Sequence, residues 1–111
     1  MAPRPVPEGS PLSLDRIIHG PLRLGIVAAL ASTERRTFTE LRDALGATDG
    51  NLNASLQKLE QAGYVAAARK MEGRTTFTEY QLTRAGQKAL ATYLEQLERI
   101  VGPLRDRRGG G

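Results

Sequence analysis

The feature that most limits the fold of this chain is a change of hydrophobic period at Gly63. Before that residue, Leu52, Leu56 and Leu59 recur every three or four positions, which is the spacing of a helix with one buried face. After it, residues 64–82 favour a pair of strands. The middle of the chain is therefore expected to run from a helix directly into a β-hairpin.

Three helices are predicted before residue 47 from their apolar spacing and their end signals. A short first helix is expected to begin after Ser13, and Pro21 fits the first turn of a second helix. A third is expected to open at Phe38, with Thr39 as its cap and Gly46 as its left-handed stop. The inward-facing side chains expected in these helices are Leu14, Ile17, Ile18, Leu22, Ile26, Val27, Leu30, Leu41, Ala44 and Leu45.

The hairpin and one long helix complete the expected elements. Strands over 64–71 and 75–82 flank a turn in which Gly73 takes the positive-φ position. Thr83 then caps a last helix. The apolar residues of that helix are spaced by threes and fours: Leu90, Tyr93, Leu94, Leu97, Ile100 and Val101. The fold class is thus mainly α with a small β-hairpin.

The two ends of the chain differ in composition from its middle. Residues 1–11 hold four of the six prolines and predict a disordered tail. Residues 103–111 form a basic, glycine-rich tail after an expected helix stop at Gly102–Pro103. The folded domain is therefore expected over residues 12–102, enough for one core.

Composition argues against an enzyme. The 111 residues include no cysteine and one histidine, His19, which leaves no thiolate nucleophile and no multi-histidine metal cluster. The acidic residues show no converging catalytic pattern, and we expect neither a metal nor another cofactor. The absence of cysteine and of any signal or membrane-spanning segment predicts a cytoplasmic protein without membrane contact.

The charge balance makes nucleic acid the first partner to consider. The formal net charge is +4 and the pI is about 10.0. Arginine, which outnumbers lysine thirteen to three, suits phosphate and guanine edges. A mild positive charge can also serve solubility alone, so the positions of the cations must decide.

The order helix, helix, helix–turn–helix, hairpin, helix is that of a winged helix–turn–helix. Residues 56–65 resemble the end of the recognition helix and the start of the wing in ArsR- and MarR-type bacterial transcriptional regulators. Residues 80–86 resemble their closing wing strand and the helix after it, and residues 19–26 resemble a stretch common in the ArsR-like branch. The resemblance covers residues 14–101 and implies DNA binding and a dimer formed by the terminal helices. The cysteine, histidine and acidic sites of metal-sensing ArsR relatives are missing here.

The helix that carries Leu52, Leu56 and Leu59 is expected to enter the major groove of duplex DNA. Asparagine and glutamine can bond adenine edges bidentately, small residues allow close approach, and hydroxyl or ammonium groups reach phosphates. The candidate residues on this helix are Asn51, Asn53, Ala54, Ser55, Gln57 and Lys58, with Gly50 beside them. An ordinary polar helix face is the alternative.

The hairpin tip supplies cations beside that helix. Arg69, Lys70 and Arg74 lie around Gly73, with Glu72 opposing them, and can follow a phosphate backbone or enter a minor groove. Arg35, Arg36 and Arg42 are weaker candidates for phosphate contacts.

The last helix predicts a homodimer, because its far end projects beyond the body and leaves apolar side chains to be covered by a second copy. The expected interface joins this helix to the first one and comprises Leu14, Ile17, Ile18, Leu90, Tyr93, Leu94, Leu97, Ile100 and Val101. Use of part of this stripe in the chain's own core is the alternative.

These observations predict a dimeric regulator that binds double-stranded DNA sequence-specifically and represses by occluding a promoter. A winged-helix module for protein–protein contact, without DNA binding, is the alternative function. An apolar small-molecule effector between the dimer-forming helices stays open, without positive support in the sequence.

Overall fold

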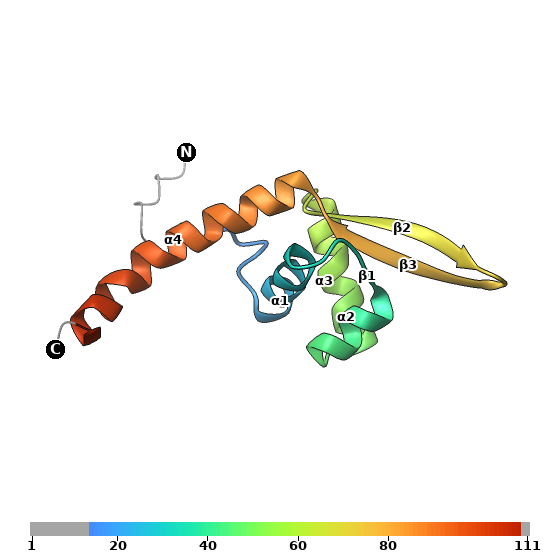
Figure 1. Cartoon of the computed structure of the whole chain (residues 1–111), viewed down its shortest axis with the longest axis horizontal. Helices are drawn as coiled ribbons and strands as arrows, with labels where there is room; N and C mark the ends of the chain where they lie inside the picture. Colours follow the sequence, from blue (N-terminus) through green and yellow to red (C-terminus); the bar gives the residue numbers. More distant parts are fainter. Residues whose placement is uncertain (1–13, 110–111) are drawn as a thin grey trace, which may run out of the picture.

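The computed structural model describes residues 14–109, with the side chains of residues 14–105. The expected tail over residues 1–11 and the expected cap Ser13 lie outside this range. The elements follow in the order α1 (Pro21–Ala31), β1 (Arg36–Thr37), α2 (Phe38–Leu45), α3 (Asp49–Gln61), β2 (Val65–Glu72), β3 (Thr75–Leu82) and α4 (Arg84–Gly109) (Figure 1). This is the predicted winged helix–turn–helix, with the short strand β1 as an addition.

The three strands form one antiparallel sheet in the order β1-β3-β2. β2 and β3 pair along their whole length, from Val65 opposite Leu82 to Glu72 opposite Thr75. The two-residue loop between them has a positive φ at Gly73 (62°) and at no other position, the pattern of a type II′ turn. β1 pairs only with the residues of β3 nearest the core, so the distal hairpin is two-stranded. We call its residues 69–78 the wing.

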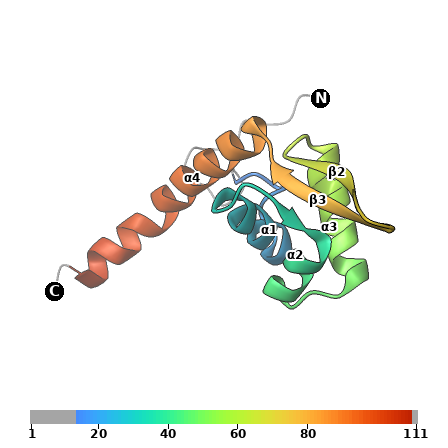
Figure 2. The same cartoon turned by 45° about the vertical axis from the view of Figure 1, so that its right-hand side comes forward.

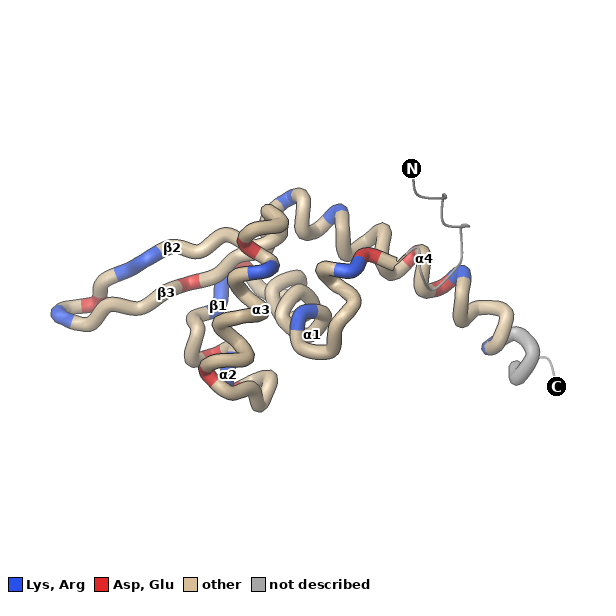
Figure 3. Tube along the Cα trace, turned by 180° about the vertical axis from the view of Figure 1, so that it is seen from behind, with Lys and Arg blue, Asp and Glu red and all other residues tan. Residues whose placement is uncertain are grey.

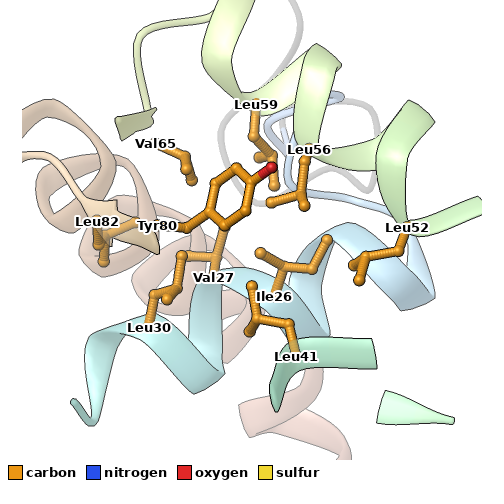
Figure 4. Packing of buried hydrophobic residues seen from close by; sticks show 10 residues of the cluster. All are labelled: Ile26, Val27, Leu30, Leu41, Leu52, Leu56, Leu59, Val65, Tyr80 and Leu82. Carbon is orange, nitrogen blue, oxygen red and sulfur yellow. The ribbon is translucent and has the colours of Figure 1, made fainter. Parts of the chain in front are cut away.

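The main core lies between α1, α2, α3 and the inner ends of β2 and β3. Its side chains interdigitate around Tyr80, whose ring lies among leucines from the surrounding elements (Figure 4). The cluster comprises Ile26, Val27, Leu30, Leu41, Leu52, Leu56, Leu59, Val65, Tyr80 and Leu82. The three predicted inward leucines of α3 are fully buried, so that prediction is confirmed.

A smaller cluster joins α4 to the segment before α1. Leu14, Ile18 and Tyr93 are buried in it, and Tyr64 packs against both this cluster and the main core. The Tyr93 hydroxyl is hydrogen-bonded to Nδ1 of His19 at 3.0 Å. The first turns of α4 are thereby fixed to the body of the domain.

The wing and α4 project from the body in different directions (Figures 1 and 2). The molecule measures 58 × 45 × 24 Å, with a radius of gyration of 16.8 Å, against about 13 Å expected for a compact domain of this size. The two projections therefore expose much surface that the chain itself does not cover.

The predicted first helix is wrong: residues 14–20 form turns. The Asp15 side chain accepts hydrogen bonds from the backbone N–H groups of Ile17 (2.8 Å) and Ile18 (3.3 Å). A side chain that binds nearby N–H groups in this way competes with helix formation, and Gly20–Pro21 ends the segment before a helix can extend.

The predicted cap of α2 is also wrong, by two residues. Thr37 is the cap: its Oγ1 accepts from the Glu40 N–H at 3.1 Å, and the Glu40 carboxylate accepts from the Thr37 N–H at 3.0 Å. This reciprocal capping box begins the helix at Phe38. Ala44, which we expected inside, is exposed. Gly46 ends the helix with φ 61°, as predicted.

Pro103 does not end the last helix where the sequence predicts a stop. α4 continues to Gly109 with Pro103 inside it. A proline within a helix removes one backbone hydrogen bond and costs about 3 kcal/mol. An ion pair between Glu98 and Arg105 spans this position and links the turns on either side of the proline.

The junction between β3 and α4 is closely fixed to the end of α3. Thr83 caps α4, as predicted, by accepting the Gly86 N–H at 3.0 Å, and its hydroxyl donates to the Gly63 carbonyl at 2.6 Å. The Thr83 N–H donates to the Tyr64 carbonyl at 3.0 Å. A Cβ atom at Gly86 would lie 2.2 Å from that carbonyl oxygen, so only glycine fits there.

Candidate nucleic-acid interface

α3 presents one polar face that its own chain leaves uncovered. Thr48 fixes the start of the helix by accepting the Asn51 N–H at 3.2 Å, and the leucines on its inner side set its rotation. The predicted outward residues Gly50, Asn51, Asn53, Ala54, Gln57 and Lys58 are all exposed, and Ser55 is half-buried. This face can offer amide donors and acceptors to the edges of bases in a groove.

Gln61 belongs to the same face, and the sequence prediction missed it. It is exposed and follows Gln57 by four residues, so the two amides lie one above the other on the helix. The i, i+4 spacing was the available signal.

Arg42 links α2 to the start of α3 instead of pointing to a partner. Its Nη1 lies 3.1 Å from Asp49 Oδ1 and its Nε 3.2 Å from Asp43 Oδ1. The hydrogen bond to Asp49, followed by that to Asp43, raises the pKa of Arg42 above its usual value. The expectation that Arg42 supplies a phosphate contact is therefore not supported, since two carboxylates already accompany its charge.

Arg36 is similarly engaged. Its Nη1 lies 3.5 Å from Glu40 Oε2, on the first turn of α2. The hydrogen bonds from Thr37, backbone first, and then the nearby guanidinium of Arg36 lower the pKa of Glu40 below its ordinary value. Of the three weaker arginine candidates, Arg35 is exposed and makes no ion pair with the residues described.

The wing places its cations on different faces. Arg69 stands opposite Thr78 and Lys70 opposite Phe77, and successive residues of a strand point to opposite sides. Arg69 therefore shares the side of Val65 and Tyr80, toward the helices, while Lys70 lies on the outer side. With Arg74 at the tip, the charges are distributed along the wing (Figure 3) rather than gathered around Gly73 as we expected.

A largely exposed apolar side chain accompanies the cations of the wing. Met71 is 72% exposed and lies two residues after Arg69, hence on the same side. The sequence prediction did not single it out, since methionine in a strand usually serves packing. An exposed methionine of this kind offers a flexible apolar contact to a partner.

The residues expected in the dimer interface differ in how far their own chain covers them. Leu14, Ile18 and Tyr93 are buried against one another within the chain, so they do not form part of its free surface. Leu94 and Leu104 are 51% and 57% exposed. The remaining expected residues, Ile17, Leu90, Leu97, Ile100 and Val101, are half-buried. Leu104 was missed because the helix was expected to stop before it.

Neither a metal-binding cluster nor a membrane-spanning helix is found among the described residues. No group of three or more His, Cys, Asp or Glu side chains in residues 14–105 could hold a metal ion. None of the four helices, as far as the structure describes them, has the length and apolar character needed to cross a membrane.

Comparisons with known proteins agree with this geometry. A family profile described as a winged helix DNA-binding domain matches residues 22–101. An uncharacterized protein of Methanocaldococcus jannaschii is 30% identical over 82 residues, which are 74% of this chain and 89% of that protein. A transcriptional regulator homologue from Pyrococcus horikoshii OT3 has a similar structure, with a TM-score of 0.76 and 27% identity over 81% of this chain and 89% of its own. The transcriptional repressor CouR, bound to a 23-mer DNA duplex, gives a TM-score of 0.66 and 25% identity over 85% of this chain and 70% of its own.

Proposed function

The chain belongs to the winged helix DNA-binding domain family, and from this we propose that it is a sequence-specific regulator of transcription. It binds duplex DNA as a homodimer and represses by occluding a promoter. The observation that carries the proposal is the exposed amide face of α3 beside a cationic wing. The structural likeness to a repressor bound to a DNA duplex supports the same function.

α3 reads the sequence in this proposal. Asn51, Asn53 and Gln57 contact base edges, and each good bidentate contact discriminates by about 1–3 kcal/mol against the wrong base. Ala54 and Gly50 let the helix backbone approach the groove. The buried leucines anchor α3 to the core, so the positions of its exposed side chains relative to the rest of the domain are fixed.

The wing and the ends of α3 supply affinity. Ser55 and Lys58 reach phosphates beside the groove, and Arg69, Lys70 and Arg74 follow the backbone or the minor groove. The local charge is only modestly positive, since acids on α2 and α3 offset part of it. Tight binding to random DNA is therefore not expected.

Dimerisation through α4 fits the proposal because its open side carries Leu94 and Leu104, which are more than half exposed. A second copy covers them and places two α3 helices for half-sites about 34 Å apart on one face of the duplex. Occlusion is the simplest mode of regulation for such a dimer, because a protein bound across a promoter blocks access to it.

Fluorescence anisotropy across a salt series tests the function. We expect the logarithm of the affinity to fall linearly with the logarithm of salt concentration. Arg74→Gln lowers that slope by about one, whereas Gln57→Ala relaxes sequence preference at one position. Flat titrations with promoter and random duplexes alike would exclude DNA binding and favour a protein–protein module.

A further inference from the structure

A hollow of about 450 Å³ lies beside the C-terminal end of α3. Its walls come from three separate parts of the chain: the turn before α1, α1 itself and α3. The lining residues are Arg16, Ile17, Arg23, Lys58, Gln61 and Ala62. The hollow thus gathers three cations, one from each of these parts of the chain.

No carboxylate forms an ion pair with these cations in the described part of the chain. None lines the hollow, and within residues 14–105 neither Arg16, Arg23 nor Lys58 makes an ion pair. By contrast, Arg36 and Arg42, on the other side of the helix–turn–helix, both pair with acids. The hollow therefore holds three cations without an ion-paired acid, with the Asp15 carboxylate bonded to the N–H of the lining Ile17 at 2.8 Å, and this excess of cations favours an anionic partner.

The Arg23 side chain is held in place by two backbone carbonyl groups and not by an acidic side chain. Its Nε donates to the Ile17 carbonyl at 2.5 Å and its Nη2 to the Arg16 carbonyl at 3.3 Å. These neutral acceptors leave other N–H groups of the guanidinium for a ligand. Because its position is fixed before binding, Arg23 loses less side-chain entropy than a free arginine when it meets an anion.

The hollow adjoins the exposed polar face of α3. Lys58 and Gln61 line it and are exposed on α3 together with Gln57. α3 lies between the wing on one side and α1 with its preceding turn on the other (Figures 1 and 3). A duplex seated on α3 therefore has cations on both sides of that helix.

We propose that this hollow binds a phosphate group of the DNA backbone, on the side of α3 opposite the wing. The inference rests on the proposed function and extends the interface to Arg16 and Arg23, which lie outside the helix–turn–helix and the wing. Arg23, whose side chain is already fixed, and the flexible Lys58 donate hydrogen bonds to the phosphate oxygens. Arg16 adds positive charge at the edge of the hollow.

Salt-dependent duplex binding by the full chain tests the proposal with Arg16→Gln, Lys58→Gln and the double variant. Complete loss of this phosphate contact lowers the salt slope by about 0.9, which corresponds to about eightfold weaker binding at 0.1 M salt if affinity at 1 M is unchanged. The double variant should approach this full loss, and each single variant should show part of it. Lys88→Gln, at an exposed cation of α4, is the matched control and leaves the slope unchanged.

The outcomes separate this proposal from the function on which it rests. A wild-type slope that survives in Arg16→Gln, together with a double variant no different from Lys58→Gln, overturns the phosphate site and leaves DNA binding intact. Absence of duplex binding by the wild type overturns both. Saturable binding of inorganic phosphate, lost in the double variant while the duplex slope stays unchanged, identifies a free-phosphate site and also overturns the assignment to the DNA backbone.

Discussion

Tyr64 connects three parts of the molecule at the scale of a single residue. Its hydroxyl donates a 2.5 Å hydrogen bond to Asp15 Oδ2, its carbonyl accepts the N–H of Thr83, and its ring contacts both apolar clusters. The end of α3, the segment before α1 and the start of α4 are therefore positioned by one side chain and its backbone.

Replacing Tyr64 by phenylalanine should destabilise the fold by about 1–3 kcal/mol, because a hydrogen bond to a charged acceptor is lost and Asp15 is left without this partner. Urea unfolding at neutral pH measures the change. Thr92→Ala, at an exposed position of α4, is the control and should leave stability within about 0.5 kcal/mol. Equal stability of Tyr64→Phe and the wild type would show that the hydrogen bond contributes nothing.

The same hydrogen bond predicts a loss of stability at high pH. The hydrogen bond to Asp15, then burial, raises the pKa of Tyr64 from 10.0 to about 12. Folding therefore favours the protonated phenol, and this contribution is complete below pH 10 and lost as the pH rises toward 12. The difference in unfolding free energy between the wild type and Tyr64→Phe should shrink over that interval. A difference independent of pH between 9 and 12 would contradict this assignment.

Gly86 is required by space rather than by backbone conformation. A Cβ there would lie 2.2 Å from the Tyr64 carbonyl oxygen and 2.6 Å from Leu82 Cδ1. Gly86→Ala should therefore cost about 3 kcal/mol, at the upper end of overpacking effects, seen as a lower Tm. Gly50→Ala, whose Cβ meets nothing within 4 Å, should be neutral or stabilising by up to about 1 kcal/mol. Similar effects of the two substitutions would contradict the close approach.

At the scale of an element, the two faces of α3 separate stability from recognition. Leu56→Ala should cost about 2–5 kcal/mol because it opens a cavity in the main core. Gln57→Ala, at the adjacent exposed residue, should leave the unfolding free energy nearly unchanged and alter DNA preference. Chemical unfolding and anisotropy on the same two variants measure both quantities. Loss of stability in Gln57→Ala would mean that this face is packed.

The elements also show how far the sequence predicts this fold. The period of Leu52, Leu56 and Leu59 predicts α3 and both of its faces, and Gly46 and Gly73 predict their turns, because the signal lies in the residues themselves. The cap at Thr37 and the turn at Asp15 depend on which of several capable side chains wins a local hydrogen bond. Sequence spacing alone does not decide that competition.

The parts of the site that the sequence did not predict depend on tertiary arrangement. Arg42 counts as a free cation in the sequence and is paired with two acids in the fold. Arg16 and Lys58 lie 42 positions apart and meet only because the turn before α1 packs beside the end of α3. Charge counting along the chain cannot distinguish these cases, since pairing depends on neighbours from other elements.

At the scale of the whole molecule, the open side of α4 predicts a dimer. Leu94→Glu combined with Leu104→Glu should give a monomer by sedimentation, since two buried charges oppose the apolar contact. Binding to a two-half-site duplex should weaken in parallel. Thr92→Glu adds a charge on the opposite side of the helix and should leave the assembly unchanged. A monomeric wild type would remove the dimer from the proposal.

The close packing of Gly86 on the Tyr64 carbonyl has a consequence for such a dimer. With no side chain between them, the start of α4 lies directly against the segment that follows α3, so the two α3 helices of such a dimer should be held at a fixed separation. An extra base pair between half-sites rotates and shifts the second half-site by one step of the duplex, and a tightly packed junction between α3 and α4 does not readily follow that shift. The tolerance of this protein for operator spacing should accordingly be narrow.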